Sequence, residues 1–213
     1  MAEAFHDPRP VLAAYGDSLV AGWGLSSQDA LPARLEQEFL AAGRAVKVLD
    51  FGVSGDTSVD GLARLPEVLA ARPQAVLLEF GANDCYQGLP VAETQDALTQ
   101  MIEALRAENI AVFLAGWRTR SDLFHPEFDD PDLAGLVPMA PPLFNEDYVA
   151  RFNAVHADLA ATYKLPLLPH ILEPLLDPAA PGVGYFQADG VHPNARGARL
   201  LAQALAPLLL PLL

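Results

Sequence analysis

The chain has 213 residues, of which 52% are hydrophobic and 19% are charged, and its formal net charge is −14. This length allows one domain with a sizeable core, and this composition argues against intrinsic disorder. An acidic chain without a basic run repels phosphate backbones and anionic membranes, so we expect no nucleic-acid partner. The single cysteine, Cys85, excludes an internal disulfide and a cysteine-rich metal site.

The two ends of the chain predict a protein without stable membrane insertion. The first ten residues, MAEAFHDPRP, lack the basic and apolar regions of a signal peptide. The sequence as it stands therefore predicts a cytoplasmic protein, and a periplasmic or secreted one if an export signal was removed. The apolar C-terminal stretch LLAQALAPLLLPLL is too short to span a bilayer and contains Pro207 and Pro211.

Short apolar runs, typical of strands buried on both faces, alternate with segments of helical spacing. The alternation predicts a single domain over residues 1–213 with an α/β fold, a three-layer α/β/α sandwich around a parallel sheet of about five strands. In chain order we expect a strand at Val11–Tyr15, a helix at 30–43, a strand at Val46–Phe51, a helix at 61–71, a strand at Ala75–Phe80, a helix at 93–109, a strand at Ile110–Ala115, a helix at 146–163, a strand at Pro166–Leu168 and a helix at 195–206.

Polar segments follow the strands, where ligands bind in such sheets. They supply a hydroxyl, a histidine with a nearby carboxylate, and glycine and asparagine amides, which are the parts that acyl transfer needs. Taken singly, each is an ordinary turn residue; Ser18 and Asp189, for example, are typical of turns and caps. Their shared position after strands of one sheet favours a hydrolytic site. The segments read GDSLVAGWG (16–24), GVSGDTSVDG (52–61), GANDCYQG (81–88) and QADGVHPN (187–194).

These segments resemble the four sequence blocks of the GDSL or SGNH hydrolases. The resemblance rests on GDSL (16–19), Gly55 in SGDTS, Asn83 in GAND, and Asp189-Gly-Val-His192, and it extends over nearly the whole chain. The chain is most similar to bacterial arylesterases and to the multifunctional thioesterase/lysophospholipase group. The resemblance implies a flavodoxin-like SGNH hydrolase fold and hydrolysis of small carboxylic esters without metal or organic cofactor. Short-to-medium acyl esters and aryl esters are expected, with thioesters and lysophospholipids as further candidates.

Position by position, the resemblance implies a role for five residues. Ser18 would be the nucleophile, His192 its general base, and Asp189 the residue that orients the imidazole. The backbone N–H groups of Ser18 and Gly55 and the side-chain amide of Asn83 would form the oxyanion hole. Nothing in the chain matches the G-x-S-x-G motif of the larger α/β-hydrolases.

Four residues beside these blocks carry further expectations. Trp23 and Tyr86 flank the blocks, so we expect them to bind substrate by lining an acyl or aryl pocket. Asp17 is expected to hold its turn through backbone hydrogen bonds. Cys85 is expected to be a small, half-buried loop residue, because a catalytic thiol needs its own base.

The chain departs from the family pattern in two places. Ala82 stands where the third block commonly has its second glycine. The stretch at 117–138, WRTRSDLFHPEFDDPDLAGLVP, has neither helical nor strand period and is an insertion of roughly twenty residues relative to similar proteins. It predicts either a lid that limits acyl-chain length or a surface excursion, which in a homo-oligomer could contact a second copy.

Three other functions stay open at this point. The sequence does not distinguish an esterase from a carbohydrate O-deacetylase of the same superfamily. A metallophosphoesterase would use Asp17, Asp56, Asp84 and His192 as ligands, but the chain has no Asp-x-His near its start. A non-catalytic, flavodoxin-like binding domain has no need of a serine, an aspartate and a histidine in this order.

Overall fold

The computed structural model describes residues 8–119, 146–176 and 184–213. In this part of the chain, five parallel strands form one sheet in the order β2-β1-β3-β4-β5, the flavodoxin-like order expected from the sequence. The strands are β1 (Val11–Gly16), β2 (Lys47–Gly52), β3 (Ala75–Glu79), β4 (Ala111–Ala115) and β5 (Leu167–Leu168).

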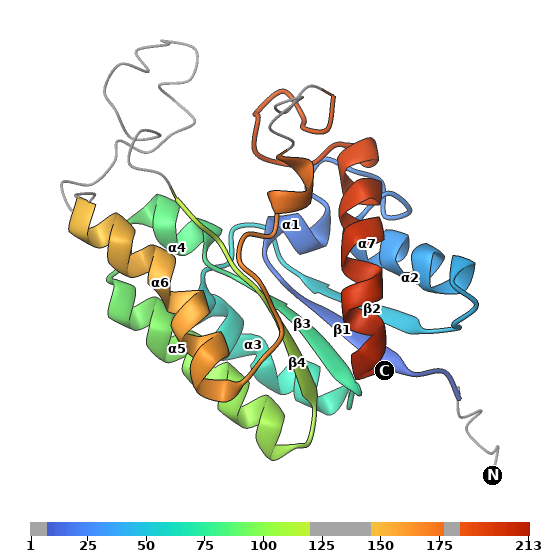
Figure 1. Ribbon diagram of the computed structural model, residues 1–213, viewed down its shortest axis with the longest axis horizontal. Coiled ribbons are helices and arrows are strands. Elements are labelled where there is room, and N and C mark those ends of the chain that lie inside the picture. Colours follow the sequence, from blue (N-terminus) through green and yellow to red (C-terminus); the bar gives the residue numbers. More distant parts are fainter. Residues whose placement is uncertain (1–7, 120–145, 177–183) are drawn as a thin grey trace.

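Helices cover both faces of the sheet, which makes the three layers of the sandwich (Figure 1). The helices α2 and α7 pack side by side on one face, and α3, α5 and α6 pack in a row on the other. The helices are α1 (Ser18–Ala21), α2 (Leu31–Ala41), α3 (Ser58–Ala70), α4 (Ala82–Gln87), α5 (Val91–Ala107), α6 (Glu146–Tyr163) and α7 (Ala195–Leu209), with short 3₁₀ turns η2 (Glu173–Leu175) and η3 (Leu210–Leu212).

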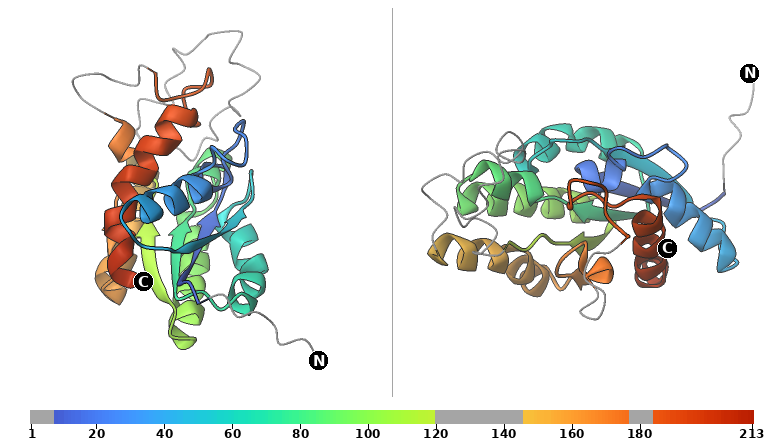
Figure 2. Two further views of the ribbon diagram at one scale, coloured as in Figure 1. Left: turned by 90° about the vertical axis from the view of Figure 1, so that its right-hand side faces the viewer. Right: turned by 90° about the horizontal axis from the view of Figure 1, so that it is seen from above.

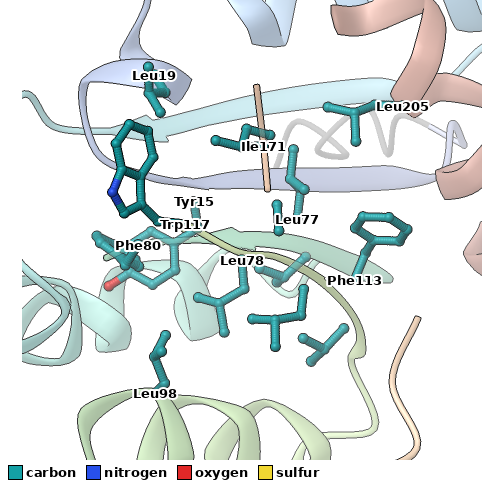
Figure 3. Packing of buried hydrophobic residues seen from close by; sticks show 14 of the residues in the cluster. Tyr15, Leu19, Leu77, Leu78, Phe80, Leu98, Phe113, Trp117, Ile171 and Leu205 are labelled. Carbon is teal, nitrogen blue, oxygen red and sulfur yellow. The ribbon is translucent and has the colours of Figure 1, made fainter. Parts of the chain in front are cut away.

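The core lies on both sides of the two central strands (Figure 3). Every residue of β3 is buried, because helices cover it from either side, and this explains why the strand is almost continuously apolar. Leu77 points to the layer that contains Leu205 of α7, whereas Leu78 points to the layer that contains Leu98 of α5. Alternate side chains of one strand therefore pack against the helices on opposite faces of the sheet.

The parallel strands place all their carboxyl ends at one edge of the sheet. This is the upper edge in Figure 1, and the right view of Figure 2 looks down on it. The short helices α1 and α4 follow β1 and β3 at this edge, and α7 begins there and ends at the opposite edge. The loops after β1, β2 and β3 and the segment before α7 thus lie together, as the sequence predicted.

The observed elements agree with the predicted ones to within about three residues at each end. The sequence predicted no helix at GDSL or GAND, where the structure has the short helices α1 and α4. A helix of one or two turns has no hydrophobic period that a sequence pattern could reveal. Of the stretch at 117–138, the structure places Trp117 and Thr119, both buried, at the end of β4; residues 120–138 lie outside the described residues.

Candidate active site

Ser18 lies at the point where the central strand β1 turns into the short helix α1. Asp17 caps this helix, since its Oδ1 accepts a hydrogen bond from the N–H of Leu19 at 2.9 Å. Gly16 permits the close approach of β3, because a Cβ at this position would lie 2.5 Å from the backbone oxygen of Glu79. The glycine and the aspartate of the block therefore build the turn, as expected for Asp17, and place the half-buried Ser18 at the edge of the sheet.

The hydroxyl of Ser18 meets a histidine from the other end of the chain. Its Oγ lies 2.9 Å from Nε2 of His192, and Nδ1 of the same ring lies 2.8 Å from Oδ2 of Asp189. A histidine with its proton on Nδ1 donates that proton to Asp189 and accepts the serine hydroxyl at Nε2. The three side chains thus form one chain of hydrogen bonds that can carry a proton away from Ser18.

A tight turn before α7 fixes His192 relative to Asp189. Oδ1 of Asp189 accepts the N–H groups of Val191 and His192, each at 2.9 Å, while Oδ2 holds the ring. Asn194 caps α7 and accepts the N–H groups of Arg196 and Gly197. Burial tends to raise the pKa of Asp189, but its hydrogen bonds outweigh burial and lower the pKa below the ordinary carboxyl value. Asp189 is therefore an anion at neutral pH.

The second and third blocks contribute Gly55 and Asn83 at the same edge. Gly55 has a φ of 93°, which an L side chain rarely adopts, and it is exposed. Asn83 lies in the first turn of α4, and its Nδ2 donates to the backbone oxygen of Asp56 at 2.8 Å and to Oδ2 of Asp17 at 3.3 Å. Asn83 therefore connects the loop that carries Gly55 to the turn that carries Ser18.

The chain is similar to known proteins over most of its length. The profile of the GDSL-like Lipase/Acylhydrolase family matches residues 14–200. The chain belongs to this family. It is 34% identical to Esterase TesA of Pseudomonas aeruginosa over 200 residues, which cover 93% of this chain and 87% of that protein. It is 32% identical to Thioesterase 1/protease 1/lysophospholipase L1 of Escherichia coli K12 over 199 residues, covering 92% and 82% of the two chains.

Solved structures show the same relationship. The crystal structure of TesA superposes with a TM-score of 0.75 at 32% identity, covering 95% of this chain and 99% of that one. Membership in a family of lipases and acylhydrolases makes this protein an ester hydrolase. The structure brings the side chains of Ser18, His192 and Asp189, which the sequence blocks singled out, within hydrogen-bond distance of one another.

Sequence reasoning missed Glu79, a buried acid that contacts the turn of Ser18. Glu79 ends β3 and is completely buried, and its Oε2 lies 3.4 Å from the N–H of Asp17, which is also completely buried. Burial raises the pKa of Glu79 well above its ordinary value, and the charge of Asp17 raises it further. Burial also raises the pKa of Asp17, to about 6. The sequence signal was available, because Glu79 is the one acid in an otherwise apolar strand.

The two flanking aromatic residues differ in exposure. Trp23 is 56% exposed, and its ring centroid lies 6.2 Å from that of His192. Tyr86 is half-buried on α4 and lies 5.9 Å from the ring of Trp117 at the end of β4. Both rings are therefore at the carboxyl edge, on elements that adjoin Ser18 and Asn83.

Cys85 lies in α4 and not in a loop, and it is fully buried rather than half-buried. Burial raises the pKa of its thiol to about 11, so the group stays protonated at neutral pH. The helix α4 places the side chain of Cys85 in the hydrophobic core, away from the carboxyl edge of the sheet. Its thiol therefore has no access to substrate.

The four residues of the metallophosphoesterase alternative have other partners, which for Asp17 are the N–H of Leu19 and the amide of Asn83. Asp56 forms an ion pair with Arg64, Asp84 accepts hydrogen bonds from Ser58 and Thr94, and His192 contacts Ser18 and Asp189. Within the described ranges, no group of three or more metal-ligating side chains comes together. None of the helices in these ranges has the length and the apolar character needed to cross a membrane.

Proposed function

We propose that the protein hydrolyses small carboxylic esters through a covalent acyl-serine intermediate, with Ser18 as nucleophile, His192 as general base and Asp189 as the residue that orients the imidazole. The observation that carries this proposal is the pair of contacts made by the His192 ring, 2.9 Å to Ser18 Oγ and 2.8 Å to Asp189 Oδ2. A nucleophile in contact with a base that a third group orients is the arrangement that activates a serine.

The reaction has two halves. In the first, Nε2 of His192 accepts the hydroxyl proton while Ser18 Oγ attacks the acyl carbon, and the imidazolium then donates that proton to the leaving alkoxide. In the second, a water molecule loses a proton to His192 and attacks the acyl-serine; the imidazolium then returns this proton to Ser18 Oγ as the bond to the acyl carbon breaks, which releases the acid and restores the hydroxyl. The anionic Asp189 stabilises the imidazolium in both halves without accepting its proton.

Three donors would stabilise the negative oxygen of the tetrahedral intermediate. The N–H of Ser18 opens α1 and so has no partner within that helix, and the N–H of Gly55 lies in an exposed loop. The amide of Asn83 is the third donor; its longer contact, 3.3 Å to Asp17, is the one that an oxyanion would replace. Donors aimed at developing charge usually supply the largest single part of the rate enhancement.

The substrates that we propose are short-to-medium acyl esters and aryl esters, with thioesters and lysophospholipids as further candidates. The exposed ring of Trp23 beside His192 and the half-buried ring of Tyr86 offer apolar surface next to the nucleophile. The related proteins carry the names esterase, thioesterase and lysophospholipase, which fits this range.

The decisive experiment measures hydrolysis of p-nitrophenyl esters from acetate to palmitate, with wild type and Ser18→Ala side by side. The variant should lose at least about a thousandfold in kcat/KM and keep its circular dichroism spectrum, because only binding and the oxyanion donors remain. A fluorophosphonate should label the wild type on the peptide that contains Ser18, as identified by mass spectrometry. Labelling of another peptide, or an active alanine variant, would overturn the proposal.

A further inference from the structure

Arg64 is a largely buried cation for which the proposed reaction has no direct use. It lies in the second turn of α3, and only 17% of its side chain is exposed. The helix starts at a capping box, in which the side chain of Thr57 accepts the N–H of Asp60 while Asp60 accepts the N–H of Thr57. This cap fixes the start of α3 and thereby the direction in which Arg64 projects, toward the carboxyl edge of the sheet.

The guanidinium of Arg64 contacts three segments at once. Its Nε lies 2.5 Å from Oδ2 of Asp56, and its Nη2 donates to the backbone oxygens of Phe51 at 3.1 Å and Gly16 at 3.3 Å. The group also lies over the ring of Tyr15, 4.9 Å from the centroid. The ends of β1 and β2 and the loop before α3 are therefore held by a single side chain.

These contacts converge on the three proposed oxyanion donors. Gly16 lies two residues before Ser18, and Asp56 directly follows Gly55. The backbone oxygen of Asp56 is also the acceptor for the amide of Asn83. Ser18 is thus two residues from Gly16, and Gly55 is one residue from Asp56, and Arg64 binds both Gly16 and Asp56. Asn83 is connected to Asp56 by one hydrogen bond.

We propose that Arg64 is a positioning residue that sets the three oxyanion donors relative to one another, acting through Gly16 and Asp56. This inference rests on the proposed function, since it concerns the same site. Arg64 itself touches no substrate. Its effect is to fix the distance between the turn of Ser18 and the loop of Gly55, which come from different strands.

The chemistry of the guanidinium suits arginine to this position. Its planar fork can bind a carboxylate on one side and backbone oxygens on the other, whereas the ammonium of lysine is a single point charge. The side chain of Asp56 is only 14% exposed, so removal of Arg64 leaves a carboxylate that is poorly solvated and unpaired. The loop of Gly55 then rearranges toward water, and a displacement of about 1 Å at such a site can cost about a hundredfold in rate.

The test compares Arg64→Ala and Arg64→Lys with Arg106→Ala as a matched control. Arg106 also donates to a backbone oxygen, that of Tyr163, and also lies over an aromatic ring, but it is at the far end of α5. Steady-state kcat and KM with a p-nitrophenyl ester, and thermal unfolding, are measured for each variant and for Ser18→Ala.

Both Arg64 variants should lower kcat by about tenfold to a hundredfold with little change in KM, because the donors act in the transition state. Guanidinium chloride at non-denaturing concentrations should restore part of the kcat of Arg64→Ala, whereas sodium chloride at equal ionic strength should not. The Arg106 variant should retain the kcat of the wild type. A fall in the unfolding temperature of Arg64→Ala with unchanged kcat, or a change in KM alone, would overturn the inference. An active Ser18→Ala would instead overturn the proposed function.

Discussion

Asn83→Ala removes the amide that connects the turn of Ser18 to the loop of Gly55. In the structure this amide donates to the backbone oxygen of Asp56 at 2.8 Å and to the buried carboxyl group of Asp17 at 3.3 Å. Each of these acceptors loses one donor, so the free energy of unfolding should fall by about 1–3 kcal/mol. The same amide is a proposed oxyanion donor, and loss of one such donor typically lowers kcat by about 10²–10³.

The assay is steady-state hydrolysis of p-nitrophenyl butyrate, run beside thermal unfolding. Asn83→Ala should lower kcat and leave KM nearly unchanged, because the amide meets the oxyanion more strongly than it meets the ground-state carbonyl. Gln74→Ala is the control, since its Oε1 accepts the N–H of Val11 at the opposite edge of the sheet. This control should lower stability without lowering kcat. If Asn83→Ala raised KM alone, or changed kcat no more than Gln74→Ala, its assignment to the oxyanion hole would be wrong.

Three further results are expected. His192→Ala should cost as much kcat as Ser18→Ala and the double variant little more, because the pair acts as one proton-transfer unit; additive losses in kinetic assays would contradict this. Burial raises the pKa values of Asp17 and Glu79, so the folded state binds more protons than the unfolded chain and stability falls as pH rises from about 4 through about 6. Glu79→Gln should make the unfolding temperature fall less steeply over this range, and an unchanged slope would refute proton binding by Glu79. Iodoacetamide should leave activity intact at neutral pH, because the thiol of Cys85 is buried and its pKa is raised to about 11; rapid inactivation with labelling of that residue would show that the site opens.

Much of the fold followed from patterns that are local in the chain. The apolar runs and the helical spacing predicted five strands and the long helices between them, because burial on both faces of a parallel sheet demands these patterns. The position of Ser18 after the first strand and of His192 before the last helix followed from the same reasoning. Parallel strands carry their carboxyl ends to one edge, so residues far apart in sequence could be expected to meet there.

Other features depend on partners that no local pattern encodes. The single-turn helix at Ser18 has a local cap in Asp17, but the close approach of β3 that Gly16 permits forms only when the sheet is assembled. The sequence shows Glu79 as the one acid in an apolar strand, but its complete burial against Asp17, which decides the protonation state that it prefers, is a property of the folded chain.

The sequence by itself determined which chemical groups are present at the carboxyl edge and their order along the chain. Only the tertiary structure decided how those groups are held, as Arg64 shows, because no sequence pattern indicated a role for this residue. The folded chain brings its guanidinium against Asp56, Phe51 and Gly16, from three different segments. The long side chain of an arginine can adopt many conformations. The packing of α3 on the sheet, which is a long-range interaction, decides which neighbours this side chain contacts.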